Sequence, residues 1–172
     1  MILNNYKRLA LAKHFSDASV VILSEAVHSI DGNSDKNIRA NQSFLDYGSI
    51  VRDMYEQATI PSGACTAFDL VIGKGGTAPT ADDYKLEEQL YSNIGISNSS
   101  ISKSGTTVTI SRTFKNFTGS SITVKEFGVK TGYYNSGGYQ RPVLLTRDVL
   151  SESLTVPNNS SFTIQVTIAL QV

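Results

Sequence analysis

The chain has little cysteine and little histidine, and each shortage excludes a class of site. Its 172 residues include a single cysteine, Cys65, so it can form neither an intramolecular disulfide nor a zinc site built from several thiolates. The two histidines, His14 and His28, have no partner at ligand spacing. One cysteine and two isolated histidines give no nucleophile–histidine–acid set. We therefore expect no catalytic residues, no metal and no cofactor, and we expect that the protein is not an enzyme.

Long apolar runs and an excess of charge of either sign are also missing. No run approaches the roughly 20 residues that a transmembrane helix requires, and residues 1–15 lack the continuous apolar region of a signal peptide. Fifteen basic and fifteen acidic residues cancel, so no overall field favours nucleic acid or an anionic membrane surface. We expect a protein that is made in the cytoplasm and has neither nucleic acid nor a membrane as a partner.

What the sequence does contain is the pattern of a weakly charged β-protein. In the last eleven residues, apolar side chains at the even positions from Phe162 to Val172 alternate with polar or small ones. A period of two indicates a half-buried strand, which we expect to close the β-domain. Turn residues separate further short strands, as is typical of an antiparallel, jelly-roll-like β-sandwich. The predicted strands are residues 66–72, 95–103, 106–117, 121–131, 142–150, 153–156 and 161–172.

The first sixty residues have a weaker, mixed pattern. Apolar residues at spacings of three and four predict a short amphipathic helix between residues 2 and 14, and residues 44–55 carry a second helical stripe. Residues 31–35 have the composition of a turn or loop. Such a segment rarely offsets the entropy of its own ordering. We therefore divide the chain into a partly helical anchoring or oligomerisation arm, residues 1–60, and a β-sandwich domain, residues 61–172.

Two charged residues face each other in the hairpin expected around Thr118-Gly119. One register of that hairpin places Arg112 directly opposite Glu126, each on an otherwise apolar face. The face of Glu126 includes Ile122 and Val124.

A third charged residue, Arg147, falls on the apolar face of Val143 and Leu145. Inward charges are usually paired, so we expect a structural ion pair of Glu126 with Arg112 or Arg147. The alternative reading, a carboxylate poised for acid–base chemistry, lacks a second carboxylate in the pattern.

A tyrosine-rich loop is the one candidate contact surface. Tyr133, Tyr134 and Tyr139 flank a Gly/Asn-rich stretch between two strong strands. Exposed tyrosines on such a loop can contact a protein or a glycan, and the alternative is that they cover the open end of the sandwich. The glycine-rich run Gly73-Lys74-Gly75-Gly76-Thr77 lacks the spacing of a P-loop, so we interpret it as a loop that leaves a strand.

Several motifs, taken in order, resemble small virion structural proteins of tailed bacteriophages. In those proteins a strand ends in a Gly-rich turn, and a stretch with threonine, proline, aspartate, tyrosine, leucine and glutamate follows, as in residues 72–87 here. Residues 113–116, 122–129 and 144–150 are similar to the later strands, and the Thr-Val-Pro turn with the alternating last strand is similar to the ends. The resemblance covers residues 66–172, and residues 1–60 lie outside it.

The resemblance implies a non-enzymatic virion structural protein that is assembled in the host cytoplasm. It would act as a head fibre, a capsid decoration protein or a tail component. Its partners would be copies of itself, in a homo-oligomer, and neighbouring capsid or tail proteins. The alternative function is a carbohydrate-binding β-sandwich module that uses the loop of Tyr133, Tyr134 and Tyr139.

Overall fold

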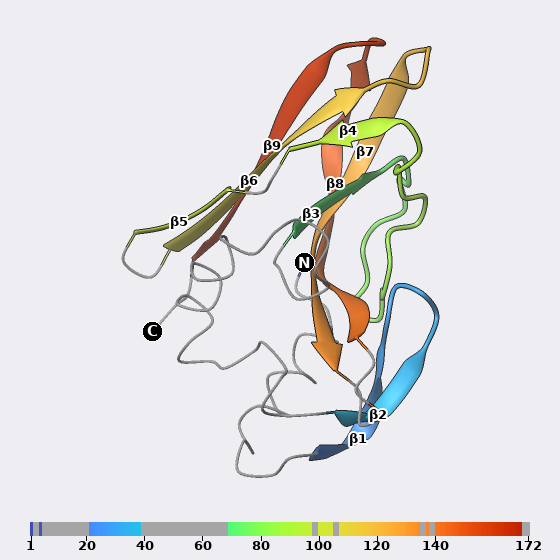
Figure 1. Cartoon of the computed structure of the whole chain (residues 1–172), viewed down its shortest axis with the longest axis vertical. Coiled ribbons are helices and arrows are strands. Elements are labelled where there is room, and N and C mark those ends of the chain that lie inside the picture. Colours follow the sequence, from blue (N-terminus) through green and yellow to red (C-terminus); the bar gives the residue numbers. More distant parts are fainter. Residues whose placement is uncertain are drawn as a thin grey trace.

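The computed structural model describes residues 1, 4, 21–38, 69–97, 100–104, 107–134, 137 and 140–169, and these form a mainly β fold (Figure 1). The helices expected at residues 2–14 and 44–55 lie outside this range, apart from Asn4, which is helical. The strands are β1 (Val21–His28), β2 (Ser34–Ile38), β3 (Asp69–Gly73), β4 (Ile94–Ile96), β5 (Ser100–Ser104), β6 (Thr107–Asn116), β7 (Ile122–Tyr134), β8 (Gln140–Val156) and β9 (Ser161–Ala169).

The described strands form three antiparallel sheets. Strands β1 and β2 make a two-stranded hairpin, and the order of the second sheet is β3-β7-β8. In the third sheet, β6 is central. Strand β9 pairs with β6 over its whole length, while β5 and β4 pair with the two ends of β6. Because β9 occupies one edge of β6 throughout, β4 and β5 share the other edge.

The expected hairpin of β6 with β7 is wrong, because the two strands belong to different sheets. The chain crosses between the sheets at residues 117–121, and the buried Asn116 fixes this crossing. The Asn116 side-chain amide donates to the backbone oxygens of Ser120 (2.7 Å) and Val156 (2.9 Å), and its oxygen accepts the N–H of Thr118 (2.9 Å). A Thr-Gly turn signal therefore marks a connection between sheets here.

Two strand predictions differ from the structure in number. Residues 142–150 and 153–156 belong to one long strand, β8, and residues 95–103 contain two strands, β4 and β5. The expected gap between the two strands is an irregularity within β8, where residues 150–153 lie opposite the single residue Lys125 of β7. At a second irregularity, Leu145 is an extra residue of β8 with no partner in β7, because Val129 pairs with Thr146 and the next residue, Lys130, pairs with Leu144.

The second and third sheets share one cluster of buried apolar side chains. Leu70 and Ile72 of β3 meet Ile110 and Phe114 of β6 in this cluster. Its buried members are Val27, Leu70, Ile72, Ile101, Ile110, Phe114, Ile122, Val124, Val129, Val143, Leu145 and Val156. A smaller cluster of Val71, Leu86 and Leu144 forms apart from it. The smaller cluster includes Leu86 from the segment between β3 and β4, so that segment covers part of the β3-β7-β8 sheet.

The hairpin of β1 and β2 contacts the larger part of the chain. Val27 is fully buried in the large cluster, and Ile30 packs against the small one. The Ile30 N–H donates to the oxygen of Pro142 (2.9 Å), and Arg141 lies near the carboxylates of Asp31 (3.5 Å) and Asp35 (3.7 Å). The division of the chain at residue 60 stays a prediction, since most of residues 1–60 lies outside the described range.

Candidate functional site

The structure brings Glu126 of β7 and Arg147 of β8 together in a buried ion pair. The Arg147 Nε donates to Glu126 Oε2 over 2.8 Å, with 4% of the Arg147 side chain and 0% of the Glu126 side chain exposed. A buried charge is tolerated only where its partners replace the water it loses. The other contacts of these two residues therefore decide what the pair can do.

Both residues lie on the face of the sheet opposite to the one the sequence pattern predicts. Arg147 shares a row with Gly128 and Val71, and Glu126 shares a row with Gly73, so both lie on the Val71 face. Val124 and Leu145, their expected neighbours, lie in the cluster on the other face. The two irregularities of the β7–β8 pair reverse the alternation of side chains, as an extra residue in a ladder does.

The carboxylate of Glu126 accepts four hydrogen bonds. Besides Arg147, it accepts backbone N–H groups of the segment that joins β3 to β4, residues 74–93, which we call the covering segment. Gly75 donates to Oε1 over 3.0 Å, Glu88 donates to Oε1 over 2.8 Å, and Glu87 donates to Oε2 over 3.1 Å. One amide of the glycine-rich run, that of Gly75, thus binds a carboxylate of the protein itself.

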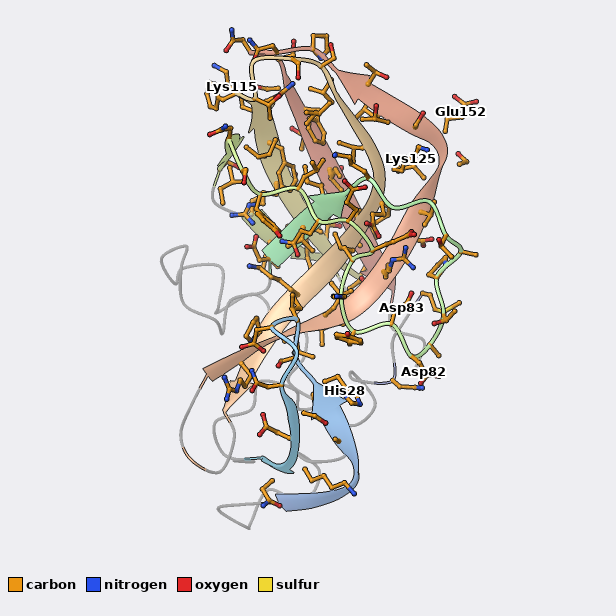
Figure 2. All side chains as sticks on the ribbon, turned by 90° about the vertical axis from the view of Figure 1, so that its right-hand side faces the viewer. His28, Asp82, Asp83, Lys115, Lys125 and Glu152 are labelled. Carbon is orange, nitrogen blue, oxygen red and sulfur yellow. The ribbon has the colours of Figure 1, made fainter. Side chains whose placement is uncertain are left out.

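Arg147 also binds the covering segment. Its Nη1 donates to Asp83 Oδ2 over 2.7 Å, and its Nη2 donates to the backbone oxygen of Thr77 over 3.1 Å. Glu87 Oε2 lies 3.5 Å from the guanidinium. Figure 2 shows Asp82 and Asp83 on the covering segment beside the sheet, with Asp83 above His28 of β1. All three nitrogens of the guanidinium are therefore engaged by the fold.

The covering segment is held in shape by its own polar residues. Thr77 donates its N–H (3.0 Å) and its hydroxyl (2.9 Å) to the Glu87 carboxylate. Thr80 donates its N–H (3.0 Å) and its hydroxyl (2.9 Å) to Asp83. The segment surrounds a pocket of about 300 Å³, whose lining includes Arg147. Because the polar groups of Arg147, Asp83 and Glu87 bond to each other or to the covering segment, this arrangement fixes the segment on the sheet.

The pKa values of the charged groups agree with this arrangement. Burial disfavours ionisation of Asp83, but the hydrogen bonds from Thr80 and Arg147 outweigh it and hold the pKa below the ordinary 3.8. The bonds from Thr77 lower the pKa of Glu87 below 4.5. Burial opposes the charge of Arg147, yet its bonds to Asp83 and Glu126 raise its pKa. All three shifts favour the ionised network.

The stability of the protein should accordingly depend on pH in the acid range. The folded pKa values of Asp83 and Glu87 lie below their unfolded values, so the unfolded chain binds more protons as the pH falls. Their contribution is complete above about pH 5 and is lost as the pH falls through the lowered folded values. We expect a thermal midpoint that is constant between about pH 7 and pH 5 and drops in stronger acid. A smaller acid drop in Asp83→Asn tests the assignment, and an unchanged drop contradicts it.

Arg112 does not meet Glu126, and this alternative for the ion pair is wrong. Arg112 points from β6 to β3, where it pairs with Asp69 and donates to the backbone oxygen of Leu70 (3.0 Å). Its Nε donates to the oxygen of Ser97 (3.0 Å). The side chain is 4% exposed. Arg112 therefore joins the two larger sheets, while Arg147 joins one sheet to its covering segment.

The tyrosine-rich loop falls at the edge of the described part of the chain. Tyr133 and Tyr134 belong to the end of β7, but the positions of their side chains are not among the described features, and Tyr139 lies outside the described residues. Their role therefore stays a prediction.

Sequence reasoning missed Asp69, Asp83 and Glu87, which complete the two arginine sites. A local signal existed for Asp83, because a threonine followed three residues later by an aspartate can close a hydrogen-bonded turn. No local signal exists for Asp69 or Glu87, whose arginine partners lie far away in the sequence.

Comparison with protein-family models, curated proteins and solved structures found no match to this chain. Within the described ranges, no group of three or more histidine, cysteine, aspartate or glutamate residues is arranged to hold a metal ion. A search of the same residues found no helix with the length and apolar character needed to cross a membrane.

Proposed function

We propose that this chain is a non-enzymatic structural protein of a tailed-bacteriophage virion, built as a jelly-roll-like β-sandwich. It would assemble with copies of itself and with neighbouring capsid or tail proteins, after synthesis in the host cytoplasm. Residues 1–60 would serve as the anchoring or oligomerisation arm.

The proposal is supported by the structural role of the residues that carry the resemblance. Thr77, Thr80, Asp83 and Glu87 form the bonds that shape the covering segment or attach it to Arg147. Leu86 is buried in the small cluster with Val71 and Leu144. The resembling stretch is thus a structural device that fixes a long connection to a sheet. The polar groups of Thr77, Thr80, Asp83 and Glu87 are engaged in that device, which favours a role in assembly over a role in chemistry.

The proposal predicts that the chain is a component of purified particles. Particles of the phage that encodes it should be separated on a density gradient and analysed by quantitative mass spectrometry. We expect its peptides at a constant ratio to the major capsid protein across the particle peak, and at the same ratio after a high-salt wash. A chain that stays in the soluble lysate and is missing from the particle peak would contradict the proposal.

A further inference from the structure

Strand β9 has a regular, uncharged edge that no described strand covers. It pairs with β6 without a register shift from Ser161 to Ala169, and within the described residues no strand pairs with its other edge. The strand contains no charged residue, no proline and no glycine. Its even-numbered apolar residues are only partly buried: Phe162, Ile164, Val166 and Ile168.

The backbone bonds of β6 show which groups of β9 point to that open edge. Asn116 of β6 donates its N–H to Ser160, on the β9 side, while the oxygen of Thr113 accepts from Ser97, on the opposite side. Backbone groups alternate along an antiparallel strand, so the even-numbered residues of β6 bond to β9. Their partners in β9 are even-numbered as well, as in the pair of Arg112 with Ile164. The backbone groups of the even-numbered residues of β9 therefore point to β6, and those of the odd-numbered residues point away from it. The N–H and C=O groups of Thr163, Gln165 and Thr167 therefore point outward.

The edges of the β3-β7-β8 sheet differ from this one. Residues 88–90 cover the edge of β3, where Leu90 donates to Ile72 (2.8 Å) and Lys74 to Glu88 (2.9 Å). Along β8, the backbone of Met1 bonds to both the N–H and the oxygen of Arg147. Strand β8 also contains a proline and several charged residues. Proteins use coverage, proline and charge to stop edge strands from pairing with other chains, and β9 has none of these devices within its nine residues.

We propose that β9 pairs antiparallel with β9 of a second copy of this chain, about a two-fold axis at Gln165. This inference rests on the proposed assembly role and names the surface that would serve it. The occupant is a second copy because the strand is complementary to itself in this register. Gln165 would bond to Gln165 of the other copy, and Thr163 would lie opposite Thr167. The partly buried apolar row would continue across the axis, with Ile164 opposite Val166.

The charge of the chain is compatible with this dimer, since a formal net charge of +0 leaves no overall repulsion between copies. A shared β-sheet with the same strand from both subunits is an isologous interface, which closes as a dimer and does not propagate. The two β6–β9 sheets would become one continuous sheet.

The first test measures the mass of the full chain in solution by light scattering after size-exclusion chromatography. We expect twice the monomer mass for the wild type and the monomer mass for Gln165→Pro. Proline removes the outward N–H, and an edge strand accepts proline where its N–H faces solvent. Circular dichroism should show an unchanged β spectrum for the variant. The matched control, Gln165→Thr, should remain a dimer.

The second test fixes the register by single cysteines in a background with Cys65→Ser. Hydrogen-bonded neighbours across an antiparallel pair have Cα atoms about 5.5 Å apart, within the range that a disulfide spans. Gln165→Cys should therefore form a covalent dimer on mild oxidation. Thr163→Cys should not, because the two copies of this position would lie about 14 Å apart, four residues along the strand.

The results separate this inference from the proposed function. A wild-type monomer at high concentration, or a dimer that persists in Gln165→Pro, would overturn the β9 pairing. Cross-linking of Thr163→Cys in place of Gln165→Cys would overturn the register. Either result can occur in a chain that is still found in purified particles, so the virion proposal is judged by the particle measurement alone.

Discussion

Replacing Glu126 with alanine is expected to lower the free energy of unfolding by about 3–5 kcal/mol, the usual cost of leaving a buried charge without its partner. The substitution removes the carboxylate from Arg147, which is 4% exposed. It also removes the acceptor of three backbone N–H groups, those of Gly75, Glu87 and Glu88. Asp83 stays beside Arg147 and limits the loss, but it cannot accept the three backbone groups.

Urea unfolding of Glu126→Ala and Glu88→Ala measures this effect against a matched control. Glu88 is also a paired glutamate, with Lys74 at 2.8 Å, but its side chain is 61% exposed. Exposed pairs contribute about 0–1 kcal/mol, so Glu88→Ala should be close to the wild type. Small and equal effects of the two substitutions would show that the Glu126 carboxylate contributes little to stability.

Gly73→Ala should be nearly as damaging, because the covering segment lies too close to the end of β3 for a side chain. A Cβ atom at this position would lie 2.4 Å from Glu126 Oε1 and 2.6 Å from the backbone oxygen of Glu88. The Glu88 oxygen accepts the N–H of Lys74, and nearby Leu90 donates to the oxygen of Ile72 in β3. The Glu88 oxygen therefore cannot move away without disturbing these two hydrogen bonds. We expect a loss of about 3 kcal/mol, at the upper end of the usual cost of overpacking.

The control for this substitution is Gly76→Ala, three residues along the same glycine-rich run. A Cβ atom there would approach only Cδ of the flexible Lys125 side chain, at 3.7 Å. We expect its thermal midpoint to lie within a few degrees of the wild type, and that of Gly73→Ala to fall clearly below it. Equal midpoints for the two variants would contradict the close packing of the covering segment on β3.

The strands were the part of the structure most open to sequence reasoning. Side-chain alternation located β6, β7 and β9 within a few residues, because one face of each is buried and the other is polar. It also identified Glu126 and Arg147 as charged residues in apolar patterns. Periodicity reports burial along one strand and does not report which strands are neighbours. The Thr118-Gly119 turn was therefore interpreted as a hairpin, while the structure has a crossing between sheets.

The composition of the site was less predictable, because it depends on irregularities without a sequence signature. The inserted Leu145 and the four residues opposite Lys125 turn Arg147 and Glu126 to the face of the covering segment. Strict alternation would have placed both with Val124 and Leu145 in the main core. Asp83 and Glu87 come from a connection without strands, where no periodicity applies. Such polar contacts between distant residues depend on how the segment packs on the sheet, and they cannot be predicted from the local sequence pattern.

The most direct test of the central claim, that Glu126 fastens the covering segment to the sheet, is amide hydrogen exchange in the wild type and in Glu126→Ala. The claim predicts that the amides of Gly75, Glu87 and Glu88 are protected in the wild type and exchange much faster in the variant. The amides that join β6 to β9 should stay protected in both. Fast exchange of the three amides in the wild type, or unchanged protection in the variant, would contradict the claim.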